Sequence, residues 1–163
     1  IDGALARAGR PNMAVVGELM TAPYFSSPPP KSTGRELFDR AYVENLITRC
    51  RKDGAGDEDI IATAVQLTAQ SVADAYRRFI PEPISEVLVS GGGARNPVLF
   101  EAIARAAAPL AVRQFSEVYF DGEAKEAVAF ALLGFLHVTR RTANVPAATG
   151  ARGHRVLGKL TPA

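Results

Sequence analysis

One stretch of the sequence, residues 85–97, restricts the backbone more narrowly than any other. It opens with a short run rich in β-branched residues, which is a strand pattern, and this run leads directly into three consecutive glycines. Asn96 and Pro97 follow, a pair typical of a helix start, with Asn at the cap and Pro in the first turn. The stretch therefore predicts a strand, a glycine turn and a helix in immediate succession.

A turn of this kind can bind an anion. Backbone N–H groups at a helix start lack partners within the helix, and glycine lets a ligand approach the backbone closely. Hydrogen bonds from such amides to a charged phosphate contribute about 1.5–3 kcal/mol each. We predict a nucleotide-binding loop made of Gly91, Gly92, Gly93 and Asn96. The alternative, a tight turn capped by Asn96 that holds no ligand, stays open at this point.

Two well-known phosphate-binding motifs are excluded by single residues. A dinucleotide-binding fingerprint that starts at Gly91 needs glycine five positions later, where Asn96 stands. A Walker A loop that ends at Lys31 and Ser32 needs glycine directly before the lysine, where Pro30 stands. Lys31 is then more simply explained as a solvated lysine next to a helix start.

Hydrophobic periodicity elsewhere predicts a helix-rich α/β fold. Proline-rich residues 22–34 predict an extended loop, and Thr33 with Glu36 matches a capping box. We expect a first helix broken near Gly9 and Pro11. Helices are predicted over residues 2–20, 34–50, 57–80, 97–108 and 122–141, and strands over 85–90, 111–115 and 155–160. Two or three strands are too few for a stable sheet, so we expect an incomplete one.

A third candidate is the acidic segment 121–126, which precedes an apolar helix. Carboxylates in a first helical turn are favoured by the helix dipole alone. Glu126, however, stands directly before Ala127, at the edge of the apolar stripe. A carboxylate there could face a cleft and accept hydrogen bonds from sugar hydroxyls. Glu126 is thus a candidate substrate-binding residue, with an ordinary helix-start role as the alternative.

Charge and composition disfavour several other classes of protein. A formal net charge of +2 cannot provide a basic track for nucleic acid, and residues 127–136, the longest apolar run, are about half a bilayer span. One cysteine, Cys50, excludes an internal disulfide and fits a reducing cytoplasm. His137 and His154 have no partner at metal-ligand spacing, so no metal site is assigned.

Taken together, these segments resemble the anhydro-N-acetylmuramic acid kinase family, which belongs to the superfamily of sugar kinases, heat-shock ATPases and actin. Each matching segment is weak alone, but they follow the family's order and cover essentially the whole chain. They are residues 2–9, 23–36, 91–97, 124–131, 144–151 and 156–158.

The resemblance implies an actin-like (ribonuclease H-like) ATPase fold and a reaction. The family uses ATP, with Mg²⁺, and water to open the 1,6-anhydro ring and phosphorylate O6, giving N-acetylmuramic acid 6-phosphate. This reaction recycles cell-wall sugar in the bacterial cytoplasm, and the enzyme is generally a homodimer. By the same resemblance, the glycine triplet belongs to the nucleotide side of the cleft, and Glu126 is similar to the family's sugar-contacting glutamate.

Two family segments do not occur in this sequence. Members begin with a Gly-Thr-Ser-x-Asp-Gly phosphate loop and carry a catalytic aspartate in Asp-x-Gly-Pro-Gly-Asn. Residues 1–163 are therefore expected to be the carboxy-terminal portion of a two-domain sugar kinase, without the amino-terminal phosphate-loop domain and inactive alone. The chain also starts at Ile1 rather than Met. A non-catalytic nucleotide-binding or assembly module of the same fold is the alternative.

Overall fold

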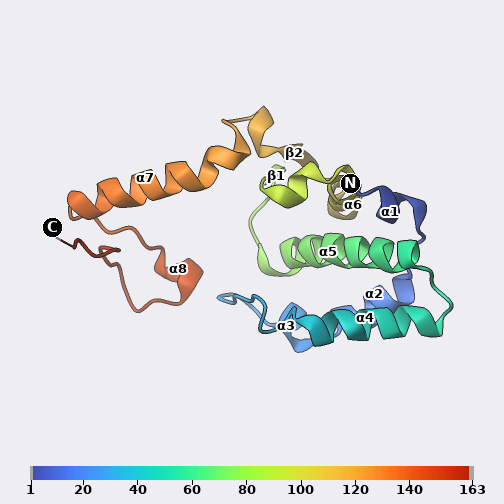
Figure 1. Ribbon diagram of the computed structural model, residues 1–163. Helices are drawn as coiled ribbons and strands as arrows, with labels where there is room; N and C mark the ends of the chain where they lie inside the picture. Colours follow the sequence, from blue (N-terminus) through green and yellow to red (C-terminus); the bar gives the residue numbers. More distant parts are fainter. Residues whose placement is uncertain (1, 162–163) are drawn as a thin grey trace.

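The computed structural model describes residues 2–161 and shows a helix-rich chain with a small sheet (Figure 1). The strands are β1 (Glu86–Val89) and β2 (Ala111–Gln114), and short 3₁₀ turns are η1 (Gly92–Arg95), η2 (Phe115–Glu117) and η3 (Gly122–Ala124). The α-helices are α1 (Ala4–Ala8), α2 (Met13–Met20), α3 (Pro23–Ser26), α4 (Arg40–Lys52), α5 (Asp57–Phe79), α6 (Pro97–Ala107), α7 (Lys125–Val138) and α8 (Pro146–Thr149).

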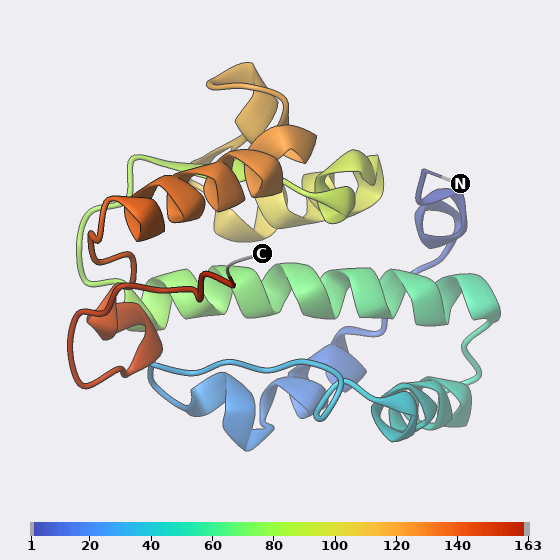
Figure 2. The ribbon, with the colours of Figure 1, turned by 60° about the vertical axis from the view of Figure 1, so that its left-hand side comes forward.

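Helix α5 is the centre of the fold, because two of its faces are apolar and each packs against a different layer (Figure 2). One face, which includes Ile60 and Leu67, packs with α2 and α4. Another, which includes Ala69, packs with α6 and is flanked by residues of both strands. Buried residues at three- and four-residue steps are what such two-sided packing requires. The predicted helix over 57–80 is confirmed.

The sheet consists of β1 and β2 in parallel, with Glu86 opposite Ala111 and Val89 opposite Gln114. Helix α6 forms the crossover between them, as a parallel pair requires. The strands predicted over residues 85–90 and 111–115 are confirmed. A sheet of two strands is only marginally stable without further strands. The third predicted strand is wrong. Within the described residues, 155–160 form no strand and pair with neither β1 nor β2, although both outer edges of this sheet are open.

Two predictions around the proline-rich loop are also corrected. Helix α4 begins at Arg40 rather than near Gly34, because the side chain of Asp39 caps it by accepting a hydrogen bond from the Tyr42 amide at 2.8 Å. Glu36 instead closes a local turn, accepting from the Gly34 amide at 2.7 Å. The loop is not extended throughout, since Pro23 starts the single-turn helix α3, a position that proline favours.

Lys31 is not a solvated lysine, because it ties the proline-rich loop together. Its Nζ donates hydrogen bonds to the carbonyls of Tyr24 at 2.8 Å and Phe25 at 3.3 Å. It also lies 4.6 Å from the ring centroid of Phe79, at the end of α5, within cation–π range. Lys31 therefore joins this loop to the central helix.

The predicted break in the first helix is confirmed between α1 and α2, and Gly9 has a packing reason to be glycine there. A Cβ at Gly9 would come within 2.1 Å of the Glu58 carbonyl oxygen, so the chain passes directly against the start of α5. The next residues are held by the same helix: the amide of Arg10 donates to Asp59 Oδ1 at 2.7 Å, and the amide of Asn12 donates to the buried Thr63 hydroxyl at 2.9 Å.

The carboxylate of Asp59 should give the fold a specific acid sensitivity. Amides of Arg10 and Gly56 donate to it, and these hydrogen bonds hold the pKa of Asp59 below its ordinary value. A depressed pKa contributes stability above the unfolded pKa, and this stability is lost as pH falls through the folded value. Urea denaturation between about pH 3 and pH 7 should therefore show that the free energy of unfolding decreases as the pH falls. This decrease should be smaller in the Asp59→Asn variant.

The matched control for this prediction is Glu58→Gln, in the same helical turn, whose side chain accepts no hydrogen bond within residues 2–161. It should leave the acid limb unchanged. If the free energy of unfolding falls equally steeply with decreasing pH in the Asp59→Asn variant, Asp59 is not the source of the acid sensitivity.

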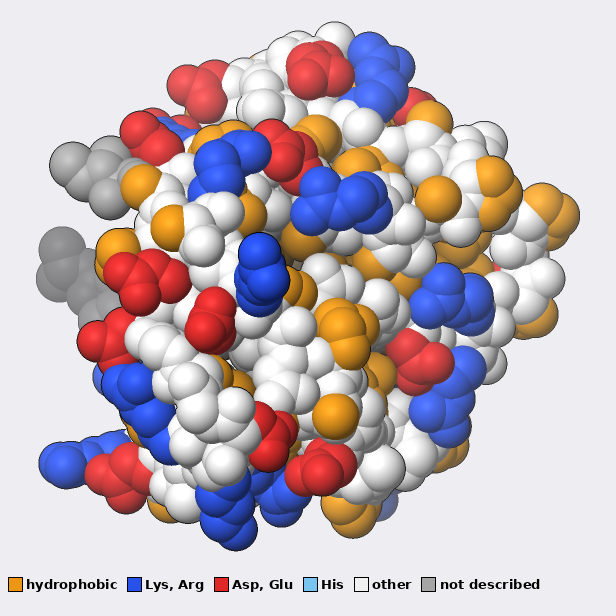
Figure 3. Space-filling view, turned by 90° about the vertical axis from the view of Figure 1, so that its right-hand side faces the viewer, with side chains coloured by type: hydrophobic (Ala, Val, Ile, Leu, Met, Phe, Trp, Pro, Cys, Tyr) orange, Lys and Arg blue, Asp and Glu red, His pale blue; other side chains and the backbone are white. Residues whose placement is uncertain are grey.

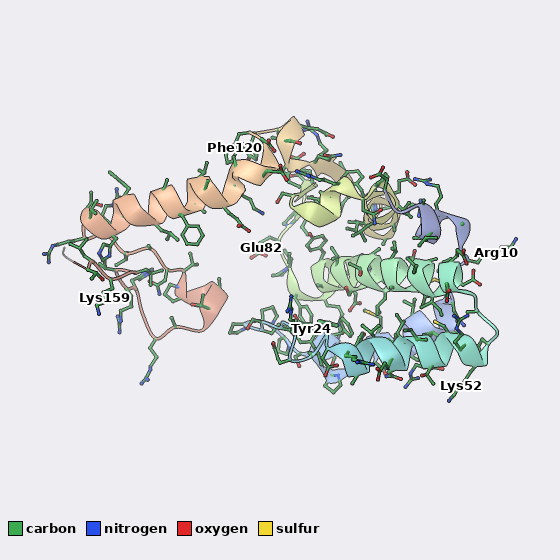
Figure 4. The ribbon with its side chains drawn as sticks, viewed as in Figure 1. Arg10, Tyr24, Lys52, Glu82, Phe120 and Lys159 are labelled. Atoms are coloured by element: carbon green, nitrogen blue, oxygen red, sulfur yellow. The ribbon has the colours of Figure 1, made fainter. Side chains whose placement is uncertain are left out.

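Among the helices of five or more residues in the described chain, α7 alone buries none of its side chains. It extends away from the helices around α5 (Figure 1), and Lys159 of the C-terminal segment lies near the distant, carboxyl end of α7 (Figure 4). Most of its large apolar side chains are exposed, Phe130 by 71% and Val138 by 70%. An apolar helix with no buried face normally marks an interaction surface.

On the face seen in Figure 3, side chains of Lys and Arg alternate with those of Asp and Glu. No large area of one sign is visible there. None of the helices within residues 2–161 combines the length and the hydropathy that a bilayer crossing demands.

Candidate functional site

A small cavity lies where the two parallel strands end at their carboxyl termini. It is lined by residues that follow β1, by residues that follow β2 and by the segment before α7, and its volume is about 70 Å³. Ligands of open parallel sheets bind outside the carboxyl ends of the strands. A larger cavity of about 260 Å³ lies at the opposite ends of the strands, beside Ile84 and Leu110, so sheet geometry favours the smaller one.

Of the three predicted glycines, Gly91 lines this cavity and has the most restrictive backbone. Its φ of 88° and ψ of −177° lie in a region that is essentially open to glycine alone. Gly92 and Gly93 do not have positive φ. A conformation that requires glycine therefore occurs at one position of the triplet, and the other two glycines form the start of η1.

Gly91, Gly92 and Gly93 are exposed residues, and their amides donate no hydrogen bond to any acceptor within residues 2–161. The carbonyls of the loop are used instead: Ala94 N donates to Gly91 O at 3.0 Å, and Asn96 N donates to Gly93 O at 3.2 Å. A Cβ at Gly91 or Gly92 would meet nothing within 4 Å. The loop thus has N–H donors without an acceptor and open side-chain positions at Gly91 and Gly92, both of which an anion site requires.

The predicted helix cap at Asn96 is confirmed. Its Oδ1 accepts from the amides of Val98 at 3.1 Å and Leu99 at 3.3 Å, so it caps α6 and occupies that helix's own free donors. The available donors are therefore those of the glycine loop, which η1 separates from α6. Asn96 does not line the cavity, and its contact with a nucleotide stays a prediction.

The charges around the cavity are mixed. Arg95 forms an ion pair with Glu123, while Asp121 Oδ1 accepts from the Glu123 amide at 3.0 Å. On the other side of the loop, Lys125 Nζ donates to Ser90 Oγ at 2.6 Å. Two cations and two carboxylates leave the loop near electrical balance, so the free amides are the local groups that favour an anion.

Glu126 lies in the first turn of α7 and is exposed. Its carboxylate makes no hydrogen bond and no ion pair within the described residues, and it does not line the cavity. The structure therefore brings Gly91 and Glu123 to one cavity but leaves Glu126 just outside it. An uncommitted, exposed carboxylate is available to accept hydrogen bonds from a ligand.

Periodicity and spacing did not single out four side chains around this cavity: Ser90, Arg95, Glu123 and Lys125. Each is an ordinary polar residue at the end of an element, where solvent exposure is the default expectation. The separation between Ser90 and Lys125 is 35 residues, so the sequence offers no local signal for their contact.

A resident metal cage does not fit the described residues. Within residues 2–161 no group of three His, Cys, Asp or Glu side chains is arranged to hold a metal ion. Glu123, beside the cavity, is already paired with Arg95. Mg²⁺ is usually held by one or two carboxylates together with substrate phosphates, and it stays an expectation from the family resemblance.

Comparison of the sequence with known proteins identifies a family. The sequence model of the family described as "Anhydro-N-acetylmuramic acid kinase" matches residues 1–163. Curated proteins of that name include one from Streptomyces avermitilis, 44% identical over 99% of this chain, and one from a Cyanothece species, 41% identical over 97%. A third, from Rhodococcus erythropolis, is 40% identical over 99% of the chain.

The matches extend over only part of each relative, 41%, 42% and 40% of their lengths in the same order. The chain thus spans about two fifths of the length of these curated relatives. Because the family model covers all of residues 1–163, the chain belongs to the anhydro-N-acetylmuramic acid kinase family.

Proposed function

We propose that this chain is part of an ATP-dependent sugar kinase that hydrolytically opens 1,6-anhydro-N-acetylmuramic acid and phosphorylates its O6. The products are N-acetylmuramic acid 6-phosphate and ADP, and the reaction serves cell-wall recycling in the bacterial cytoplasm. The observation that carries the proposal is the family match over the whole chain. Relatives at 40–44% identity that bear the same name support it.

The geometry supports a nucleotide at the glycine loop. Unpaired amides at Gly91, Gly92 and Gly93 lie where parallel strands end, next to a cavity of about 70 Å³. Pockets for small molecules usually have about 300–1,000 Å³. The cavity can therefore receive only part of a nucleotide, and the remainder of the site has to come from other polypeptide.

We propose that the other part is the amino-terminal domain of a two-domain, actin-like kinase, of which residues 1–163 are the carboxy-terminal portion. The two-stranded sheet and the unburied helix α7 favour this arrangement, because both lack the cover that such elements normally have. The catalytic aspartate and the first phosphate loop would lie in that part, and Glu126 would contact the sugar. The assembled enzyme is a homodimer in this proposal.

The function is tested with the full-length enzyme, defined here as the polypeptide of the relatives' length that contains residues 1–163. Purified enzyme is incubated with ATP and 1,6-anhydro-N-acetylmuramic acid in water enriched in ¹⁸O, and the products are analysed by mass spectrometry. The proposal expects a 6-phosphate that carries one ¹⁸O from the ring-opening water. A folded enzyme that yields no phosphorylated sugar would refute it.

The variant Gly92→Val tests the loop inside the same enzyme. Gly92 has ordinary φ and open space beside it, so valine should fit the fold but obstruct the approach of a phosphate. Nucleotide affinity, measured by calorimetry, should fall by at least about 1–2 kcal/mol, about 5- to 30-fold in Kd.

Gly17→Val is the matched control, since Gly17 is equally open but lies in α2, away from the cavity. It should leave the Kd unchanged. An unchanged Kd for Gly92→Val would remove this loop from the nucleotide site.

A further inference from the structure

Helix α7 carries Glu126 at its second position, yet no burial along the helix fixes where that residue lies. Within residues 2–161, α7 buries no side chain, and it extends away from the body of the fold (Figure 1). In Figure 4, Phe120 marks the segment that leads into α7 and lies on the same side as its start. Besides the segment after α7, where a Cβ at Gly150 would lie 3.4 Å from Pro30 Cγ, the contacts made at the first turn of α7 determine where Glu126 lies.

Two contacts join that first turn to the glycine loop. Lys125, the first residue of α7, donates from Nζ to Ser90 Oγ at 2.6 Å. Glu123, two residues earlier, forms an ion pair with Arg95. Ser90 directly precedes the glycine triplet, and Arg95 ends the η1 turn that follows it. The loop is therefore held to the start of α7 at both of its ends.

Backbone packing agrees with these side-chain contacts. A Cβ at Gly122 would lie 3.6 Å from Ser90 Cβ, so the segment before α7 runs directly against the end of β1. The two linked residues, Glu123 and Lys125, lie on either side of Ala124 and immediately before Glu126. Two links from neighbouring residues to two ends of one loop fix both the distance and the rotation between the loop and Glu126.

These links are poor candidates for a role in overall stability. The Arg95 and Glu123 side chains are 64% and 65% exposed, and ion pairs in water contribute little to folding. These two links are better suited to positioning, because phosphoryl transfer depends mainly on how the reacting groups are positioned.

We propose that Lys125, through Ser90, is a positioning residue that holds Glu126 in a fixed relation to the glycine loop. The inference rests on the proposed function, in which the loop binds the nucleotide and Glu126 binds the sugar. Lys125 itself touches neither ligand in this proposal. Its loss should therefore impair the reaction of the two bound substrates while leaving the binding of each substrate intact.

The test uses the full-length enzyme with Lys125→Met, which keeps the length of the side chain but removes the donor, and with Ser90→Ala, which removes the acceptor. Each should lower kcat by about ten-fold, since small misplacements reduce rates strongly. The Kd of a non-hydrolysable ATP analogue and the Kd of the sugar, each measured alone, should stay within about two-fold. The double variant should be no slower than either single variant, because both remove the same hydrogen bond.

Two further variants separate positioning from a loss of folding. Lys125→Arg keeps a donor of similar reach and should restore most of kcat. Lys52→Met, at the exposed end of α4 and far from α7 in Figure 4, should leave kcat unchanged. Ser90→Ala removes a single hydroxyl, so it keeps the test valid even where Lys125→Met does not fold.

The remaining outcomes each contradict the proposal. A raised Kd for the ATP analogue in Lys125→Met would make this lysine a direct nucleotide ligand. An unchanged kcat in Lys125→Met and Ser90→Ala would remove the link from the mechanism. Failure of the proposed function is seen separately, because the unmodified full-length enzyme would then form no product.

Discussion

Purified by itself, the 163-residue chain is expected to give no measurable ATP-dependent phosphorylation of the anhydro sugar. The cavity beside the glycine loop, at about 70 Å³, holds only part of a nucleotide, and Glu126 lies outside it. Phosphoryl transfer also needs a group that orients the nucleophile and positive charge near the transferred phosphate. In our proposal, those groups lie in the amino-terminal domain, outside residues 1–163.

The experiment measures ADP release and sugar phosphate in parallel for the chain and for the full-length enzyme at equal concentration. Circular dichroism of the isolated chain shows whether its helices have formed, so that unfolding is not mistaken for missing chemistry. Turnover by the folded chain above the rate without protein would contradict the division of the site between two parts.

The second large effect is expected from Glu126→Ala in the full-length enzyme. The carboxylate has no partner within residues 2–161, so its replacement should not disturb the fold. A hydrogen bond from a sugar hydroxyl to a charged acceptor contributes about 1.5–3 kcal/mol, which corresponds to about 10- to 150-fold in affinity. The KM for the sugar should rise by that factor, while the KM for ATP stays within about two-fold.

Glu117→Ala provides the matched control, because Glu117 is also exposed and lies in η2, where it pairs with Arg113. Both KM values should stay unchanged in that variant. If Glu126→Ala also leaves both KM values unchanged, Glu126 is an ordinary first-turn residue of α7.

The sequence was sufficient to predict a helix or strand where residues at the ends of that element mark its bounds. Helix α5 has acidic residues at its start, apolar residues at helical spacing and Pro81 just beyond its end, and it was predicted closely. The start of α6 follows from Asn96 and Pro97 in the same way. Strand β1 was found for a related reason, since its valines form a short β-branched run that ends just before the glycine triplet.

Predictions failed where two local signals competed or where a partner was needed. The Thr33–Glu36 pattern matched a capping box, but Asp39 a few residues later caps α4, and Glu36 closes a turn instead. Residues 155–160 have the composition of a strand, but a strand also requires pairing with another strand, and sequence periodicity does not report that pairing.

In the candidate site, too, local features could be predicted, whereas features that depend on distant contacts could not. The glycine triplet could be predicted from its neighbours, but the sequence does not say that Gly91 alone takes positive φ, since three adjacent glycines are equally permissive. The cap at Asn96 could be predicted, but not that this cap leaves the loop amides as the free donors. The contact of Lys125 with Ser90 depends on the crossover that brings the two strand ends together.

The central claim is that the amides of Gly91, Gly92 and Gly93 hold the phosphates of the nucleotide. The most direct measurement is hydrogen exchange of these amides in the full-length enzyme, compared with and without a saturating non-hydrolysable ATP analogue. Amides of exposed residues that have no acceptor should exchange fast in the free enzyme and become strongly protected when the analogue binds. Bound analogue with unchanged exchange at all three glycines would contradict the account.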